Sequence, residues 1–238
     1  QPIADLSPFQ VTMKSSQVGW STLSIIKTLW AAKNKNWSIA YVLPTMGDAM
    51  EFARTKVKPI IENNPILKSY VQEGDNMGDK RVGNSNLFFR GSFMERAAIS
   101  FTADLCCFDE VDRSDQSVLA TYASRLQHSE YKGEWAFSNP SVEGNGVSRF
   151  WAESDQKHWF IKCRGCGEEQ YLKWPDSIDP ERKCFQCREC HKELTDEERR
   201  VGRWVNKFKR GDDRKYSGYW VSSLMAPWLS ANYILEQH

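Results

Sequence analysis

The sequence carries no excess of charge of either sign. It holds 32 lysine and arginine residues against 31 aspartate and glutamate residues in a chain of 238 residues. A balance this close gives no support to a protein that binds nucleic acid through its overall charge. Any surface that contacts DNA must therefore be a local patch.

Long apolar runs are also missing. The longest covers residues 39–43, whereas a membrane-spanning helix needs about 18 apolar residues. The first residues do not have the pattern of a signal peptide, so we expect none, and the chain contains no internal repeat or low-complexity tract. With 40% hydrophobic residues it can still form a core, so we expect a globular protein without a membrane segment. The chain begins without methionine and ends inside an apolar pattern, which favours a piece of a longer protein.

Apolar runs typical of strands alternate with segments of helical periodicity. The expected strands are residues 9–13, 37–43, 87–89, 105–108 and 135–137, and the expected helices are residues 20–32, 47–61 and 118–126. This alternation predicts an α/β fold with a mostly parallel central sheet, which binds ligands at the carboxyl ends of its strands. Residues 73–86 are rich in Gly, Asp and Asn without apolar periodicity, and we expect a mobile loop there.

A change of pattern near Arg149 predicts a domain boundary. Residues 1–149 carry the alternating pattern, whereas residues 150–238 are rich in cysteine, aromatic residues and charge. We therefore expect the main α/β domain in residues 1–149. Residues 150–238 are expected to hold a small metal-binding subdomain together with the remaining elements of the main domain.

The polar segment after the first expected strand is a variant of a phosphate-binding loop. An ordinary loop reads G-x-x-x-x-G-K-[ST]: its backbone amides cradle phosphate, its lysine neutralises the charge, and its hydroxyl holds Mg²⁺. Here Gly19 and Ser21 occupy the second-glycine and hydroxyl positions, Trp20 replaces the lysine, and Lys14 stands at the first-glycine position. The residues expected to bind a nucleotide are Lys14, Ser15, Ser16, Gln17, Val18, Gly19, Trp20, Ser21 and Thr22. Taken alone the pattern is not specific, because such a spacing also occurs in ordinary loops.

Two adjacent carboxylates, Asp109 and Glu110, end a later apolar strand. ATP hydrolysis needs both, because Asp109 can anchor hydrated Mg²⁺ while Glu110 polarises the water that attacks the γ-phosphate. The alternative is an exposed strand end with two solvated acids, but the order of loop and acidic pair along the chain favours a nucleotide site. A third polar cluster, Ser138-Asn139-Pro140, ends another expected strand. It could detect loss of the γ-phosphate or be an ordinary turn.

Five of the seven cysteines lie between residues 163 and 190, which favours a metal site over disulfide bonds. Two C-x-x-C pairs there have the spacing of a tetrahedral structural Zn²⁺ site, and the expected ligands are Cys163, Cys166, Cys187 and Cys190. Cys184 or His191 remains an alternative ligand. Reduced cysteines packed in a core are the other interpretation, but four of them in polar surroundings would make a poor core. Cys106 and Cys107 lie in an apolar strand, where we expect them to be packing residues.

Residues 199–215 contain eight basic residues against two acidic ones, with Trp204 and Phe208 among them. Such a segment can contact phosphates and stack on bases. The pattern is also typical of a solvated amphipathic segment. Lys80 and Arg81 are a second candidate for DNA contact.

Together these motifs resemble the large terminases of tailed bacteriophages, in their lambda-like branch. The phosphate loop of that branch is similar to K-S-x-x-V-G-[YWK]-[ST], with the displaced lysine at its start. The resemblance extends through Y-V-L-P-T at 41–45, the helix at 48–61, D-E-V-D-R at 109–113 and the turn at 138–140. It covers most of residues 9–205.

The resemblance implies a P-loop NTPase fold of the additional-strand, catalytic-glutamate type with a small C-terminal zinc ribbon. It also implies a motor that hydrolyses ATP to move double-stranded DNA into a procapsid. It makes Lys14 the phosphate lysine and a catalytic residue, Ser21 and Asp109 the Mg²⁺ residues, and Glu110 the catalytic carboxylate. The residues that would couple ATP hydrolysis to motion are Ser138, Asn139 and Pro140. The unranked candidates for an arginine finger are Arg54, Arg125 and Arg149.

The cofactors that follow from the resemblance are ATP, Mg²⁺ and Zn²⁺. The implied partners are double-stranded DNA, a small terminase subunit, the portal protein of the procapsid and further copies of this chain in a ring. The implied location is the cytoplasm of the bacterial host. Full-length relatives also carry a C-terminal nuclease domain. No cluster of carboxylates follows Trp204, so we expect that domain to be absent from this chain.

Two other functions fit parts of the sequence. The missing standard lysine leaves open a zinc-ribbon module that binds nucleic acid on an inactive P-loop fold. A helicase-like ATPase of DNA repair is the second, although such proteins usually keep Gly-Lys-Thr in the loop. ATP turnover that DNA stimulates without unwinding would distinguish a packaging motor from both.

Overall fold

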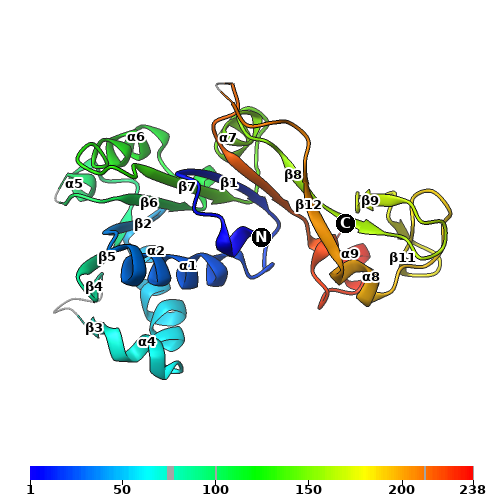
Figure 1. The fold of residues 1–238 in the computed structure, drawn as a ribbon, viewed down its shortest axis with the longest axis horizontal. Helices are drawn as coiled ribbons and strands as arrows, with labels where there is room; N and C mark the ends of the chain where they lie inside the picture. The colour runs from blue at the N-terminus through cyan, green and yellow to red at the C-terminus, as the bar shows by residue number, and fades with distance from the viewer. Residues whose placement is uncertain (74–77, 100, 212, 238) are drawn as a thin grey trace.

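The computed structural model describes residues 1–73, 78–99, 101–211 and 213–237. Within these residues, 11 strands form one large sheet, which has the order β12-β8-β13-β1-β7-β6-β2-β5-β4-β3 with β9 paired to β8. The strands of this sheet are β1 (Phe9–Lys14), β2 (Ile39–Leu43), β3 (Val71–Glu73), β4 (Asp79–Val82), β5 (Ser85–Gly91), β6 (Leu105–Asp109), β7 (Gly133–Ser138), β8 (Lys157–Lys162), β9 (Glu169–Tyr171), β12 (Gly202–Asn206) and β13 (Ser217–Val221). Figure 1 shows the sheet crossing the molecule.

The six central strands of the sheet are parallel. Each neighbouring pair in the series β13, β1, β7, β6, β2 and β5 runs in the same direction. All five residues of β6 are buried, as expected for a strand covered on both faces. Parallel strands end at one edge, so the loops after β1, β6 and β7 meet there. The prediction of a mostly parallel α/β sheet is confirmed.

Helices cover both faces of the sheet (Figure 1). One face is covered by α1 (Trp20–Lys35) and by a continuous helical run of α2 (Met46–Phe52), a π-helical turn (Ala53–Val57) and α3 (Lys58–Glu62). The other face is covered by α5 (Glu95–Ala98) and α6 (Gln116–Ser124), which pack on Cys106 and Phe108. Cys106 and Cys107 are fully buried, which confirms that they are packing residues, and burial raises the pKa of both thiols. The remaining short helices and 3₁₀ turns are Pro2–Ala4, α4 (Pro65–Tyr70), Val111–Arg113, α7 (Val147–Ala152), α8 (Asp196–Arg200), Ser223–Met225 and α9 (Ala231–Glu236).

The expected loop at residues 73–86 is wrong in its second half. There β4 pairs antiparallel with both β3 and β5, at one end of the sheet. The apolar pattern is hidden because the buried positions of β4 are Lys80 and Val82. Lys80 is 6% exposed, so the prediction that it contacts DNA is wrong as well. Residues 74–77 of the predicted mobile loop lie outside the described residues.

A cysteine lobe, formed by residues 163–200, projects from the sheet on the antiparallel arms β8 and β12 (Figure 1). It contains β9, α8 and a small pair of strands, β10 (Ile178–Asp179) and β11 (Cys184–Phe185). Its core includes Phe185 and Leu194 together with Leu224 and Ile234 from the C-terminal part of the chain. The boundary near Arg149 stays a prediction, and β8, β12 and β13 beyond it belong to the same sheet as the preceding strands.

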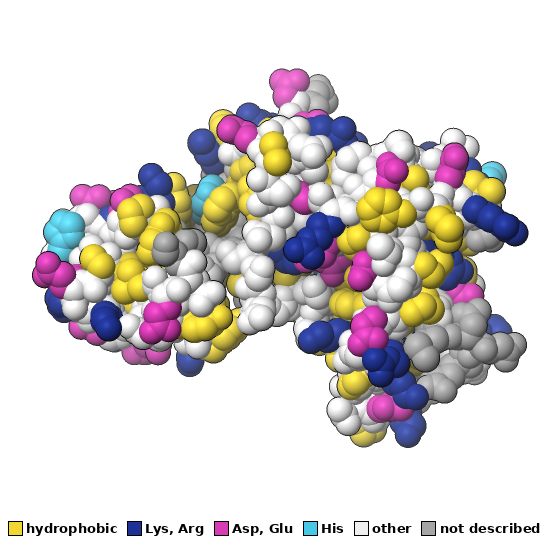
Figure 2. Space-filling view, turned by 180° about the vertical axis from the view of Figure 1, so that it is seen from behind, with side chains coloured by type: hydrophobic (Ala, Val, Ile, Leu, Met, Phe, Trp, Pro, Cys, Tyr) yellow, Lys and Arg dark blue, Asp and Glu magenta, His cyan; other side chains and the backbone are white. Residues whose placement is uncertain are grey.

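The surface carries both signs of charge. On the face in Figure 2, lysine and arginine side chains are interspersed with aspartate and glutamate. Across the described ranges, no helix is long and apolar enough to cross a membrane.

Candidate nucleotide and metal sites

The phosphate loop joins β1 to α1 at the carboxyl edge of the sheet. Lys14 is the last residue of β1, and its side chain is 7% exposed. Gln17 and Gly19 have positive φ angles of 58° and 77°, so the backbone turns sharply before α1 begins at Trp20. Glycine is favoured at position 19 because the left-handed conformation strains other residues.

The structure brings the displaced lysine to the acidic pair. Lys14 Nζ donates to Glu110 Oε1 at 2.7 Å and lies 3.9 Å from Asp109 Oδ1. Ser21 Oγ donates to Asp109 Oδ2 at 3.0 Å. Glu110 has a positive φ of 57°, a strained conformation that tends to occur at functional sites. Four residues predicted from separate motifs therefore form one contact network.

Asp109 has the environment of a metal-binding carboxylate. Burial raises the pKa of its carboxyl to about 6, against the opposite effect of the Lys14 ammonium. Its Oδ2 accepts hydrogen bonds from Ser21 and from the Tyr41 hydroxyl, the latter at 3.0 Å. Its Oδ1 is buried and has no hydrogen-bond partner among the described residues. A carboxylate oxygen that accepts no hydrogen bond, beside a serine hydroxyl, fits the oxygen ligands that Mg²⁺ prefers.

Tyr41 was missed as a site residue by the sequence reasoning. Its ring is fully buried in the core under α1, and its hydroxyl lies 2.7 Å from Ser24 Oγ as well as bonding to Asp109. The sequence showed only a tyrosine in an apolar strand. Nothing in that pattern distinguishes a packing tyrosine from one that orients a carboxylate on the neighbouring strand.

Asp112 is a second residue that sequence reasoning missed. Its carboxylate accepts hydrogen bonds from the N–H and hydroxyl of Ser141 and from the N–H of Val147, all at 2.8 Å. Its own N–H donates to Ser138 Oγ at 3.3 Å. A Cβ added at Gly146 would lie 2.5 Å from Asp112 Oδ1, so the chain approaches this carboxylate closely. Asp112 thus ties the acidic strand end to the turn after β7 and to α7.

The rest of the predicted nucleotide loop differs in exposure. Ser16, Gln17 and Thr22 are exposed, and Val18 is half-buried. Ser15 is engaged with the C-terminal part of the chain: its N–H donates to Val221 O at 2.8 Å and its hydroxyl accepts from Ser223 N at 3.1 Å. The ring of Trp20 is half-buried and tilted against Tyr219 at 6.2 Å.

A cavity of about 370 Å³ lies beside the loop. It is lined by Ser15, Ser16, Gln17, Asn139, Ser223, Leu229, Tyr233, Ile234 and Gln237. The exposed Asn139 therefore faces the phosphate loop, whereas Ser138 is buried beneath it and Pro140 is half-buried. The predicted coupling turn and the predicted phosphate loop share this cavity.

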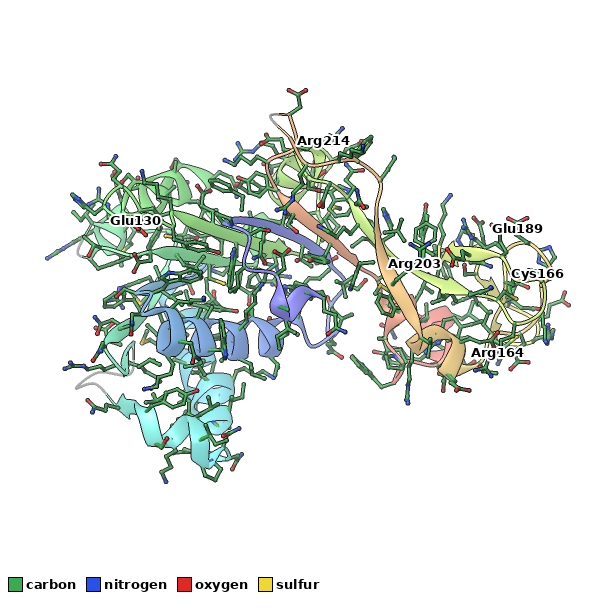
Figure 3. All side chains as sticks on the ribbon, viewed as in Figure 1. Glu130, Arg164, Cys166, Glu189, Arg203 and Arg214 are labelled. Atoms are coloured by element: carbon green, nitrogen blue, oxygen red, sulfur yellow. The ribbon has the colours of Figure 1, made fainter. Side chains whose placement is uncertain are left out.

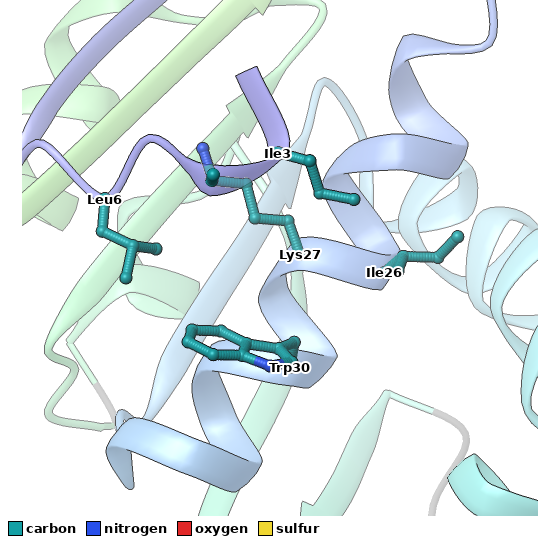
Figure 4. Close-up of a pocket in the computed structure, with 6 residues that line it drawn as sticks. Ile3, Leu6, Ile26, Lys27 and Trp30 are labelled. Carbon is teal, nitrogen blue, oxygen red and sulfur yellow. The ribbon is translucent and has the colours of Figure 1, made fainter. Parts of the chain in front are cut away.

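A second cavity, of about 400 Å³, lies on the outer face of α1 and carries none of the predicted site residues (Figure 4). It is lined by Ile3, Ala4, Leu6, Ile26, Lys27 and Trp30. Lys27 is already bonded to Gln10 Oε1 at 2.6 Å and to Pro2 O at 3.0 Å. Burial lowers the pKa of this lysine to about 8.

None of the three arginine-finger candidates contacts Lys14, Asp109 or Glu110 within the described part of the chain. Arg54 pairs with Glu51, Arg125 donates to Ser124 Oγ, and Arg149 lies over the ring of Phe150. The assignment of an arginine finger to one of these three residues stays a prediction.

The predicted basic segment is only partly available for DNA. Arg199 is 1% exposed, and Arg203 pairs with Glu169 at 2.5 Å. The guanidinium of Arg214 lies 3.8 Å from the ring of Phe208. Contact between this segment and DNA stays a prediction, from which the buried Arg199 is excluded.

Four cysteines come together at the outer end of the cysteine lobe. The thiol sulfurs of Cys163, Cys166, Cys187 and Cys190 all lie within 4.8 Å of one another. Two of the distances are 3.8 Å, from Cys163 to Cys190, and 3.7 Å, from Cys166 to Cys187. Tetrahedral Zn²⁺ with bonds of ~2.3 Å places its sulfurs ~3.8 Å apart, so the separations fit. Figure 3 shows Cys166 at this end of the lobe, with Arg164 and Glu189 nearby.

Hydrogen-bond donors around Cys187 favour the thiolate form of this residue of the thiol cluster. Burial alone would raise the pKa of Cys187, but hydrogen bonds from the N–H groups of Cys190 and Glu189 and from the Gln170 side chain lower it to about 6. Gly165 N–H donates to Cys163 Sγ at 3.2 Å. Neither Cys184 nor His191 belongs to the cluster.

Fold and site together define an α/β protein with a mostly parallel sheet and a lysine–carboxylate network at the carboxyl ends of its strands. The chain belongs to the family of phage terminase large subunit gpA ATPase domains, whose model matches residues 10–212. It is 28% identical to the large terminase subunit of Escherichia phage lambda over an alignment of 185 residues that covers 71% of this chain and 28% of that protein. The chain therefore spans well under half the length of that curated relative.

Solved structures support the fold. The chain is similar to the HK97 bacteriophage large terminase, with 14% identity and a TM-score of 0.51 over 62% of this chain and 32% of that one. It is also similar to the large terminase ATPase domain of Thermus phage P74-26, with 14% identity and a TM-score of 0.55 over 92% of this chain and 77% of that one. At these identities the likeness concerns the fold alone.

Proposed function

We propose that this chain is the ATPase motor domain of a viral DNA-packaging terminase, which hydrolyses ATP to move double-stranded DNA into a procapsid. The observation that carries the proposal is the convergence of Lys14, Ser21, Asp109 and Glu110 at one edge of the sheet. Membership of the terminase ATPase family supports it. An inactive P-loop module would not need a lysine held on the acidic pair, and a helicase-like ATPase is not favoured by the family.

Mg²⁺ would be held by Ser21 and Asp109 and would neutralise charge on the phosphates. In the structure, the Lys14 ammonium donates to Glu110. A bound γ-phosphate would compete for the Lys14 ammonium and free the Glu110 carboxylate. Glu110, with its side chain 32% exposed, would then accept a hydrogen bond from the attacking water. Lys14 would thus act as both phosphate ligand and switch for the catalytic carboxylate.

Asp112 would transmit this exchange to the coupling turn. It is two residues from Glu110 and is bonded to Ser138, Ser141 and Val147. A shift of the acidic strand end on loss of the γ-phosphate would therefore move the turn at 138–140 and the start of α7. This assigns Ser138, Asn139 and Pro140 a coupling role.

The four-cysteine cluster is proposed to hold a structural Zn²⁺ ion, so that the lobe is a zinc ribbon. The sulfur separations and the donors around Cys187 support this. Zn²⁺ would supply folding free energy to a lobe whose short strands bury little apolar surface. We propose residues 1–149 as the ATPase core, with the zinc ribbon and the closing strands of the sheet in residues 150–238.

The partners proposed for the whole protein are double-stranded DNA, a small terminase subunit and the portal protein, in a ring of copies of the chain in the host cytoplasm. In such a ring an arginine of one copy would complete the site of its neighbour, with Arg54, Arg125 and Arg149 as candidates. The nuclease activity of full-length relatives would lie outside this chain.

The experiment that tests the function is Mg²⁺-dependent ATP turnover with and without double-stranded DNA. We expect Glu110→Gln to keep ATP binding and to lower turnover by a factor of about 10² to 10⁴, the usual effect of losing a general base. Glu130→Gln, at an exposed position, is the matched control. Unchanged turnover in Glu110→Gln would remove this residue from the catalytic role, and DNA unwinding by the chain would favour the helicase-like alternative.

A further inference from the structure

The C-terminal strap, which we define as residues 222–230 between β13 and α9, borders the candidate nucleotide site. Val221, directly before it, accepts a hydrogen bond from Ser15 N, and Ser223 N donates to Ser15 Oγ. Ser223 and Leu229 of the strap line the 370 Å³ cavity beside the phosphate loop. The strap therefore contacts the phosphate loop through Ser223 and forms part of the wall of that cavity.

The strap is held by an arginine from the cysteine lobe. Arg199, on α8, is 1% exposed and donates to three backbone carbonyls of the strap, those of Leu224, Ala226 and Leu229, at 3.0–3.4 Å. Its guanidinium also lies 3.7 Å from the ring of Phe185. The nearby carboxylate is that of Asp196, at 3.3 Å, whose side chain is 67% exposed. The buried cation is thus matched chiefly by carbonyl oxygens of the strap.

The helix that carries Arg199 is bound to the thiol cluster through the adjacent residue. Glu198 Oε1 accepts a hydrogen bond from Arg164 N at 2.8 Å. Arg164 follows Cys163 in the first C-x-x-C step, Cys163 to Cys166. Glu198 Oε2 accepts from the N–H and hydroxyl of Thr195 at 2.9 Å, which closes a capping box at the start of α8. The loop that presents two thiols is therefore bonded to the helix that fixes the strap.

We propose that Arg199 is a positioning residue for the nucleotide site, and that metal held by the thiol cluster controls nucleotide affinity through Glu198, Arg199 and the strap. This inference rests on the proposed ATP-binding function. Metal orders the loop at 163–166, the loop orders α8 through Glu198, and Arg199 holds the strap against Ser15. When the metal leaves, Arg199 no longer holds the strap, and the cavity beside the phosphate loop loses the side that the strap forms.

The physical reason is that the strap has little stability of its own. It contains a single 3₁₀ turn, Ser223–Met225, and a proline at position 227. Without Arg199, the carbonyl groups of Leu224, Ala226 and Leu229 lose a charged donor. The Ala226 carbonyl keeps the bond from Leu229 N, whereas the other two must find water or another partner. The strap would then move away from the position in which Ser223 bonds to Ser15.

The test compares Arg199→Met with Arg200→Met on the full chain. Methionine keeps much of the side-chain volume and removes the donors, and Arg200 is an exposed neighbour whose loss changes the charge equally. Binding of a fluorescent, non-hydrolysable ATP analogue with Mg²⁺, zinc content by atomic emission and melting temperature are measured on each. We expect about tenfold weaker nucleotide binding in Arg199→Met, with one zinc per chain and a folded melting transition, and no change in Arg200→Met.

Removing zinc with a chelator from the unaltered chain tests the same inference without a substitution. We expect the same loss of nucleotide affinity, reversed when Zn²⁺ is returned. Hydrogen exchange of the backbone amides at 221–226, measured without nucleotide, is expected to speed up in Arg199→Met and in the chelated chain. If the unaltered chain binds no nucleotide, the proposed function fails, and the exchange measurement still decides whether Arg199 anchors the strap. Nucleotide affinity that is independent of zinc and of Arg199, or exchange that does not change, would overturn the inference.

Discussion

Replacing Asp109 with asparagine is expected to stabilise the magnesium-free chain. The Asp109 side chain is 3% exposed, and burial raises the pKa of its carboxyl from 3.8 to about 6, although Lys14 acts to lower it. The pKa is thus higher in the folded chain than in the unfolded one. The contribution of Asp109 to the free energy of unfolding is fully present below about pH 3.8, where the carboxyl is protonated in both states. This contribution is lost as the pH rises through about 6.

The magnitude follows from the same two values. At ~1.4 kcal/mol per pH unit, ionisation of Asp109 lowers the free energy of unfolding by about 3 kcal/mol at pH 8 and by about half of that at pH 5. This figure already includes the attraction of Lys14. Asparagine has the shape of the carboxylate, keeps an oxygen to accept from Ser21 and Tyr41, and cannot ionise. It also removes the carboxylate that we assign to Mg²⁺, so stability and metal binding should change in opposite directions.

Urea unfolding in magnesium-free buffer with zinc retained measures this effect. We expect Asp109→Asn to exceed the unaltered chain by about 3 kcal/mol in free energy of unfolding at pH 8, with the difference halved at pH 5. Asp104→Asn, directly before the same strand and only half-buried, is the control and should gain no such stability. The reasoning is refuted if Asp109→Asn is no more stable than the unaltered chain at pH 8.

Two further substitutions test the rest of the site. Asp112→Asn replaces an oxygen that accepts from Ser141 or Val147 with an NH₂ donor. We expect this variant to lose about 1–3 kcal/mol in free energy of unfolding and to show ATP turnover that DNA no longer stimulates. Asp115→Asn, which keeps a good helix cap, is the control and should match the unaltered chain in the same two assays. Cys166→Ser should lower bound zinc from one per chain to nearly none by atomic emission and lower the melting temperature, while Cys184→Ser keeps its zinc; equal zinc in both variants would contradict the assigned ligand set.

The elements set by local sequence were predictable. The apolar runs that became β1, β2, β6 and β7 are compact and followed by polar residues, and the helix at 20–32 begins at Trp20 as expected. The thiol cluster was predictable because its ligands lie in two short C-x-x-C steps, each of which brings two thiols together locally. Cys184 was excluded only by the fold, which places it on β11 outside the cluster.

The residues that sequence reasoning missed act over long distances. Tyr41 reaches Asp109 across 68 positions, and Arg199 reaches the strap across 25 to 30. Arg199 looked like a solvated or DNA-binding arginine because its neighbours are charged, and only the packing of α8 against the C-terminal strap buries it. β4 was missed because a lysine occupies one of its buried positions. Such roles depend on the three-dimensional packing and leave no local pattern.

Calorimetric titration of MgATP into the unaltered chain, Lys14→Ala and Lys35→Ala tests the central claim most directly. Lys14 is the cation that the structure places on the acidic pair, whereas Lys35 is an exposed lysine at the end of α1. The account predicts binding by the unaltered chain and by Lys35→Ala, and loss of binding in Lys14→Ala. Binding by Lys14→Ala with undiminished affinity would contradict the assignment of the displaced lysine to the nucleotide site.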